Sequence, residues 1–122
     1  MRSSTSPLGG AIVNVSSGAA SIGSPHEFVS YATAKAGVDA LTLGLSKEVA
    51  ERGIRVNGVA PGLVVTRLHA DAGEPGRPER IAPTVPMKRA GEPSEIAEAI
   101  AWLLSDAASY VTGATLRVAG GR

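Results

Sequence analysis

A tyrosine and a lysine four residues apart, Tyr31 and Lys35, are the side chains of this sequence best suited to acid–base chemistry. Four residues make about one turn of an α-helix, so both side chains share one helical face. A free phenol titrates at about pH 10, and an ammonium group close to a phenol favours the phenolate. A tyrosine paired with a lysine can therefore exchange a proton with an alcohol or carbonyl oxygen near neutral pH.

Further polar groups follow two short apolar runs. Ser16 and Ser17 end the strand predicted for residues 11–16, and segment 61–66 follows the strand predicted for residues 54–60. The helix that begins with Tyr31 and Lys35 leaves the same edge, because the carboxyl ends of parallel strands lie together. A serine hydroxyl at that edge could hold a substrate oxygen and help to polarise it.

The elements that position these groups alternate along the chain. A helix over residues 29–52 shows an apolar stripe of Ala34, Val38, Leu41, Leu45 and Val49, and Gly53 is its predicted stop. A second helix begins at Pro93, with an apolar stripe of Ile96, Ala99, Ile100, Leu103 and Leu104. A last strand covers residues 115–118.

The order strand–helix–strand–helix–strand predicts an α/β protein with a parallel sheet and right-handed crossovers. Two crossovers of one hand would place both helices mainly on one face, so three strands look like part of a larger doubly wound sheet. Residues 66–92 carry seven glycines and prolines and are predicted to be irregular, with one helical turn at 66–72. A loop of this length is typical of a lid or a binding loop.

Composition excludes several other classes of function. The 122 residues have a net charge of +1 and four aromatic side chains, which argues against a nucleic-acid surface. There is no cysteine, and His26 and His69 are too far apart in sequence to suggest a zinc site, so no metal is expected. No apolar run approaches the length of a membrane span, and residues 1–10 lack the apolar core of a signal peptide, so a cytoplasmic location is expected.

Four successive segments together resemble the short-chain dehydrogenase/reductase family, from about Gly10 to Arg122. They are residues 12–17 (Ile-Val-Asn-Val-Ser-Ser), 31–37 (Tyr-Ala-Thr-Ala-Lys-Ala-Gly), 55–62 (Arg-Val-Asn-Gly-Val-Ala-Pro-Gly) and 110–113 (Tyr-Val-Thr-Gly). The chain looks most like bacterial members described as 3-oxoacyl-carrier-protein reductase or glucose 1-dehydrogenase. The resemblance implies a Rossmann-like domain over residues 11–122, preceded by an irregular lead-in over residues 1–10.

The same resemblance implies hydride transfer between NAD or NADP and a small carbonyl or alcohol substrate. It makes Ser17, Tyr31 and Lys35 the catalytic residues, with Ser16 as the other candidate serine. Cofactor contacts are expected from Tyr31 and Lys35 and from a second set that follows the second strand: Pro61, Gly62, Val64 through its backbone, and Thr66. Family members associate through the helix that carries the tyrosine and lysine, so a homo-oligomer is expected.

The family's glycine-rich phosphate turn is missing from this sequence, which contains neither G-x-G-x-x-G nor a P-loop. The resemblance is therefore to the C-terminal half of the family. We expect the chain by itself to bind NAD or NADP weakly, to be inactive, and to self-associate through the open edge of its first strand. Two alternatives remain: an association module that binds relatives without catalysis, and a gene fragment.

Three other residues have simpler interpretations. His26 is expected to be an exposed loop residue, although a substrate contact is possible. Trp102 is expected to pack or to contact another subunit, and Asn57 to hydrogen-bond to the backbone near the strand exit.

Overall fold

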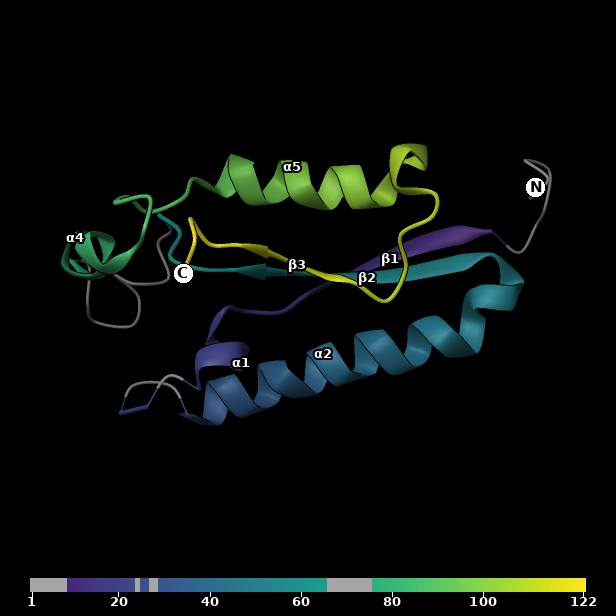
Figure 1. The fold of residues 1–122 in the computed structure, drawn as a ribbon, viewed down its shortest axis with the longest axis horizontal. Helices are drawn as coiled ribbons and strands as arrows, with labels where there is room; N and C mark the ends of the chain where they lie inside the picture. The colour runs from purple at the N-terminus through teal and green to yellow at the C-terminus, as the bar shows by residue number, and fades with distance from the viewer. Residues whose placement is uncertain (1–8, 24, 27–28, 66–75) are drawn as a thin grey trace.

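One parallel sheet forms the centre of the protein, whose computed structural model describes residues 9–23, 25–26, 29–65 and 76–122 (Figure 1). Its strands are β1 (Gly10–Val15), β2 (Ile54–Pro61) and β3 (Thr115–Val118), in the order β1-β2-β3. Gly10 is in register with Ile54, and Pro61 is in register with Val118. The α/β class and the three predicted strands are confirmed, while most of the predicted lead-in, residues 1–8, lies outside the described residues.

The two predicted long helices are also confirmed. They are α2 (Val29–Val49), continued by the 3₁₀ turn η1 (Ala50–Arg52), and α5 (Pro93–Leu104). Gly53 ends the first of them with φ 74°, a left-handed conformation that glycine adopts without strain. The remaining helical elements are α1 (Ala19–Ile22), α4 (Arg77–Ile81), η2 (Ala82–Thr84) and η3 (Asp106–Ala108). No helix within the described ranges combines the length and the apolar character that a membrane crossing requires.

The prediction that both helices cover mainly one face of the sheet is wrong. Figure 1 shows α2 on one face and α5 on the other, with the sheet between them. All three strands are parallel and each crossover moves one position in the same direction, so helices on opposite faces require crossovers of opposite hand. Both faces of the small sheet are thereby covered, as parallel strands require.

The central strand is the most buried of the three. Val56 and Val59 of β2 have no exposed surface, because the strand has a neighbour on each side and a helix on each face. β1 has one neighbouring strand among the described residues, and its Ile12 and Val15 are 43% and 49% exposed. This open edge is the one that led us to expect self-association, which stays a prediction.

The buried face of α2 differs from the predicted apolar stripe. Ala32, Thr42 and Ser46 are its buried residues, whereas Ala34 is exposed and Leu41 is 57% exposed. The prediction assumed that the most apolar side chains face the sheet. In the structure the most buried positions of α2 hold small and hydroxyl-bearing residues, while Val38, Leu45 and Val49 of the predicted stripe are half-buried.

Close packing explains why small and hydroxyl-bearing residues occupy the buried positions of α2. The Asn14 Nδ2 atom in β1 donates to Thr42 Oγ1 at 3.0 Å, and Thr42 Oγ1 donates to the Val38 carbonyl. A Cβ atom at Gly113, which has φ 79°, would lie 2.8 Å from Ser46 Oγ. Only small residues allow the helix to approach the chain this closely, and the polar groups they bring are satisfied locally.

Segment 66–92 is more ordered than predicted where it is described. It contains α4 and η2, and Ile81 and Val85 pack with Leu63 in a buried cluster. The irregular structure was predicted from the prolines of this segment. In α4 and η2, however, proline occupies the first turn, where it is compatible with a helix. The helical turn predicted for residues 66–72 lies outside the described residues.

Asn57 hydrogen-bonds to the backbone, as predicted. It is 1% exposed, its Nδ2 donates to the Val111 carbonyl at 2.9 Å, and its Oδ1 accepts from the Ala114 N–H at 3.1 Å. One side chain of β2 therefore holds the segment that leads into β3. Arg55 adds a second link, since its guanidinium donates to the carbonyls of Leu103 and Ser105 at the end of α5.

An ion pair holds the start of α5. Arg89 donates twice to the Glu95 carboxylate, at 2.7 and 2.9 Å, and Glu95 also accepts from the Glu92 N–H at 3.0 Å. These hydrogen bonds, that of Arg89 first, lower the pKa of Glu95 from its ordinary 4.5 to about 2. Because the folded pKa lies below the ordinary value, the pair's contribution to stability is present above about pH 4.5 and is lost as the pH falls toward 2.

We expect Arg89→Gln to raise the pKa of Glu95 part of the way back to its ordinary value, since the Glu92 N–H remains. An NMR titration of the Glu95 carboxyl carbon measures this. Lys47→Gln, an exposed charge on α2, is the matched control and should leave the pKa of Glu95 unchanged. An equal pKa in Arg89→Gln and in the parent chain would contradict the assignment.

Candidate active site

The predicted site residues converge at the carboxyl edge of the sheet. Figure 1 shows α1, α4, the start of α2 and the C-terminus at the end where the three strands finish. The Gly18 N–H donates to the Pro61 carbonyl at 2.8 Å, and the Gly62 N–H donates to the Val118 carbonyl at 3.0 Å. The three strand exits are thus joined by backbone hydrogen bonds, which gives the edge a defined shape.

Tyr31 and Lys35 lie together, as predicted from their spacing. The Lys35 Nζ is 5.7 Å from the centroid of the Tyr31 ring and donates to the Val15 carbonyl at 3.0 Å. The ammonium group is therefore held between the end of β1 and the tyrosine ring. Tyr31 is 44% exposed at this edge.

The two serines have different surroundings. Ser16 is 3% exposed, and its hydroxyl donates to the Lys35 carbonyl at 3.3 Å. Ser17 is partly exposed, and its Oγ accepts from the Ala19 N–H at 3.1 Å, at the start of α1. The Ser16 proton is thus engaged inside the protein, whereas the Ser17 hydroxyl can still donate.

The segment after β2 packs closely against two other segments of the chain, at Ala119 and at Gly91. A Cβ atom at Gly62 would lie 2.6 Å from the Ala119 Cβ, so no other residue fits there without displacement. Val64 forms an isolated parallel bridge with Gly91, which connects the exit of β2 to the start of α5. Pro61, Gly62 and Val64 therefore lie at the edge as predicted. Thr66 lies outside the described residues.

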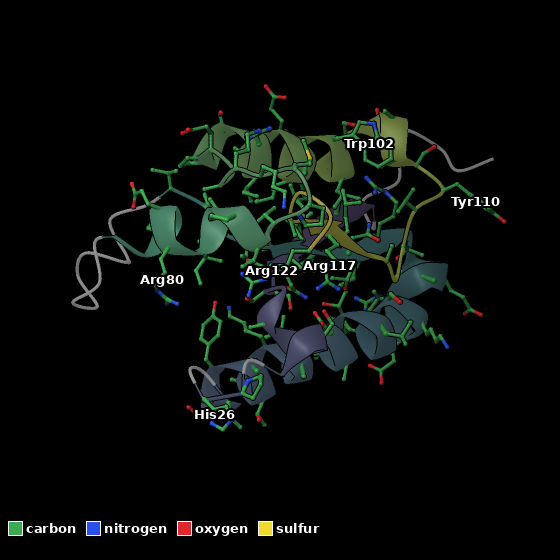
Figure 2. The ribbon with its side chains drawn as sticks, turned by 60° about the vertical axis from the view of Figure 1, so that its left-hand side comes forward. His26, Arg80, Trp102, Tyr110, Arg117 and Arg122 are labelled. Atoms are coloured by element: carbon green, nitrogen blue, oxygen red, sulfur yellow. The ribbon has the colours of Figure 1, made fainter. Side chains whose placement is uncertain are left out.

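Two other singled-out residues lie far from each other. His26 is exposed, with φ 67°, and Figure 2 shows it beside the start of α2, the helix that carries Tyr31. Trp102 is 48% exposed at the opposite end of the molecule (Figure 2). His69 lies outside the described residues, and within the described ranges no group of three histidine, aspartate or glutamate side chains could hold a metal ion.

The sequence did not predict a pocket that lies beside Ser17. It has a volume of about 280 Å³, and the residues that line it are Ser17, Ser21, Asp39, Ala60, Thr115 and Arg117. One signal was available, because Asp39 follows Lys35 by four residues and so shares its helical face. The position of Arg117 opposite that face depends on how β3 pairs with β2, and no local pattern reveals it.

Comparison with known proteins finds relatives over nearly the whole chain. Residues 2–122 match the family model described as enoyl-(acyl carrier protein) reductase. The chain is 58% identical to the uncharacterized oxidoreductase YgfF of Escherichia coli over 93% of the chain and 46% of that protein. It is 43% identical to glucose 1-dehydrogenase 2 of Bacillus subtilis over 92% of the chain and 43% of that protein.

Solved structures give the same result. A glucose/ribitol-type short-chain dehydrogenase/reductase from Brucella melitensis superposes with a TM-score of 0.81 at 40% identity, covering 91% of this chain and 44% of that one. An NADPH-bound short-chain oxidoreductase from Pseudomonas aeruginosa gives a TM-score of 0.80 at 37% identity, covering 91% and 45%. The chain spans just under half the length of these relatives. It belongs to the short-chain dehydrogenase/reductase family and matches the C-terminal region of that family.

Proposed function

We propose that this chain forms the catalytic half of an NAD- or NADP-dependent oxidoreductase that interconverts an alcohol and a carbonyl compound. The observation that carries the proposal is the placement of Lys35 Nζ between the Tyr31 ring and the Val15 carbonyl, at the edge where Ser17 also lies. The nicotinamide, when bound, accepts or supplies the hydride. The proton transfer and the positioning of the substrate oxygen are assigned to side chains of this chain.

Three side chains would divide this work. In the reductive direction, Tyr31 transfers its hydroxyl proton to the carbonyl oxygen as the hydride reaches the carbonyl carbon, which gives the alcohol. Ser17 donates a hydrogen bond to the same oxygen and holds it in place, which its partly exposed hydroxyl allows. Lys35 places its ammonium group 5.7 Å from the centroid of the Tyr31 ring, where it would attract the negative charge that the transfer leaves on the tyrosine oxygen.

The residues present fit the nicotinamide half of the cofactor. A lysine ammonium group has three donors, and the Lys35 Nζ uses one of them on the Val15 carbonyl, which leaves donors for ribose hydroxyls. The exit of β2 brings Pro61 and Gly62 to the same edge, and Val64 follows them at its bridge to Gly91. Thr66 completes the proposed set. The substrate would be a small molecule, bound beside Ser17 and Tyr31.

Lys35→Ala tests the double role of the lysine. Activity should be measured in a chimera that joins this chain to the N-terminal half of YgfF, the 58% identical relative. We expect kcat to fall and the Kd of the nicotinamide cofactor to rise, each about tenfold or more. The reason is that the substitution removes the charged donor both from the proposed proton transfer and from the proposed contact with the cofactor. Lys47→Ala, an exposed lysine on the same helix, is the matched control. A loss of kcat with unchanged cofactor affinity would contradict the ribose contact.

A second candidate function is an association module without catalysis. Its support is the exposed apolar surface of α2, where Leu41 and Leu43, on different sides of the helix, are 57% and 49% exposed. Exposed leucines favour contact with another copy, and homo-oligomerisation through α2 fits either candidate. Turnover separates the two candidates, because an association module would leave the same chimera folded but inactive.

A further inference from the structure

The outer edge of β1, the side away from β2, has no neighbouring strand within the ranges that the structure describes. The N–H groups of Gly10 and Ser16 donate to carbonyls at the start of β2 and within it, so the even-numbered residues of β1 turn their backbone groups toward β2. Alternate residues of a strand turn these groups opposite ways. Ala11, Val13 and Val15 therefore turn theirs outward, where an incoming strand could pair with them.

Apolar side chains are exposed on both faces of this edge. Asn14 donates to Thr42 of α2, so the even-numbered side chains of β1 lie on the α2 face and the odd-numbered ones on the opposite face, which α5 covers (Figure 1). Ile12 is 43% exposed on the first face, and Val15 is 49% exposed on the second. Neither helix fully covers the outermost strand, so a partner would bury apolar surface on both sides of the sheet.

The outer edge of β1 ends at the candidate active site. The Val15 carbonyl, one of the outward groups, accepts from Lys35 Nζ at 3.0 Å, and Lys35 lies beside the Tyr31 ring. A strand that pairs with β1 in the parallel direction has its own carboxyl end at the same edge of the sheet. Such a strand would therefore end beside the Tyr31–Lys35 pair.

The exposed groups indicate what kind of partner fits. A single extended peptide would pair with the backbone of β1 but would bring no helices to cover Ile12 and Val15. A second copy, related by two-fold symmetry, would pair β1 with β1 in the antiparallel direction and would place the two candidate sites at opposite ends of the joined sheet. An α/β unit that supplies a parallel strand with a helix on each face satisfies the backbone and covers both side chains.

The relatives contain a unit of the required size. This chain matches 46% of YgfF, and it superposes with a TM-score of 0.81 on 44% of the Brucella melitensis structure. More than half of each of those chains therefore lies outside the match. Because the match is to the C-terminal region of the family, the remaining part is N-terminal.

We propose that the outer edge of β1 binds the N-terminal half of a short-chain dehydrogenase/reductase as a separate chain, with one of its strands parallel to β1. Two chains then form one sheet with no peptide bond between them. Binding would also complete the site around Tyr31 and Lys35, and this consequence rests on the proposed function. Because the complex uses the same edge, it displaces the self-association expected of the chain alone.

Co-expression of the 122-residue chain with a tagged N-terminal half of YgfF tests the docking, and native mass spectrometry should show a 1:1 complex. Ala11→Pro removes an outward N–H and leaves the hydrogen bonds to β2 in place. Ile12→Asp places a charge on a surface that the complex covers. Each should lower the fraction of the half recovered as complex about tenfold or more. Leu116→Asp is the matched control, because Leu116 is 41% exposed on β3, the other edge strand, and it should not affect the complex.

Amide hydrogen exchange gives a second measurement that needs no variant. In the complex the outward amides of Ala11 and Val13 should exchange at least about tenfold more slowly than in the chain diluted to a monomer. The amides of Gly10 and Ser16 already donate toward β2 and should change little. This pattern of alternate residues distinguishes strand pairing from a general stabilisation of the fold.

Three results would overturn the proposal. They are homo-oligomers of the 122-residue chain with no mixed complex, equal recovery of the complex with the β1 variants and with Leu116→Asp, and unchanged exchange at Ala11 and Val13. Circular dichroism checks the fold of each variant. A mixed complex without turnover would contradict the proposed function alone. An active covalent chimera whose halves do not associate as separate chains would contradict this inference alone.

Discussion

Tyr31→Phe should lower kcat by about 100-fold or more in the chimera that restores the N-terminal half of the fold. The substitution removes one hydroxyl, the group proposed to move the proton, and leaves the aromatic ring beside Lys35. Because the ring and the lysine remain, cofactor affinity should change little. The measurement is steady-state turnover with saturating cofactor, together with the Kd of the cofactor.

The chain offers a matched control for this experiment. Tyr110 is the other tyrosine, it is fully exposed, and Figure 2 shows it at the far end of the molecule from His26 and the start of α2. Tyr110→Phe removes the same hydroxyl and should leave kcat unchanged. Comparable turnover in Tyr31→Phe and Tyr110→Phe would rule out the role proposed for Tyr31.

Asn57→Ala should cost about 2–4 kcal/mol of unfolding free energy. The substitution leaves the Ala114 N–H without its side-chain partner and leaves the Val111 carbonyl with only the 3.4 Å hydrogen bond from Arg55. It also opens a cavity in the most buried strand. It also loosens the segment that sets the register of β3, where the Gly58 N–H donates to the Ala114 carbonyl. Urea unfolding followed by far-ultraviolet circular dichroism measures the loss.

Asn14→Ala is the comparison variant for Asn57→Ala. The Asn14 side chain donates to Thr42 Oγ1, and Thr42 keeps its own hydrogen bond to the Val38 carbonyl when Asn14 is replaced. Asn14→Ala should therefore cost about 1 kcal/mol. If the two variants unfold at the same urea concentration, the paired hydrogen bonds of Asn57 do not hold β3 in the way described.

The sequence by itself determined the elements whose signals are local. The three strands, the beginning of α5 at Pro93 and the stop at Gly53 were all predicted and confirmed, because hydrophobic period and turn residues act over a few neighbours. The shared face of Tyr31 and Lys35 followed from their spacing, and the structure brings the two side chains together. The family followed from four short motifs that occur in order.

Tertiary structure alone decided which surfaces meet. The apolar stripe of α2 predicted that Leu41 would be buried, yet close approach to the sheet favours Ala32, Thr42 and Ser46. Local pattern also implied crossovers of one hand, whereas α2 and α5 cover opposite faces. Volume and hydrogen-bond partners at a contact depend on residues far away in the chain, and periodicity carries no information about them.

The same distinction applies within the candidate site. Ser16 and Ser17 are adjacent and chemically identical, and only the fold separates them, by burying one against the Lys35 carbonyl and leaving the other partly exposed. Asp39 and Arg117 are 78 residues apart and share a pocket because β3 pairs with β2 beneath α2. Sequence spacing identified the pair that we propose to transfer a proton. Which groups line the pocket beside Ser17 was decided by long-range packing, because a pocket wall is assembled from segments that meet only in the folded chain.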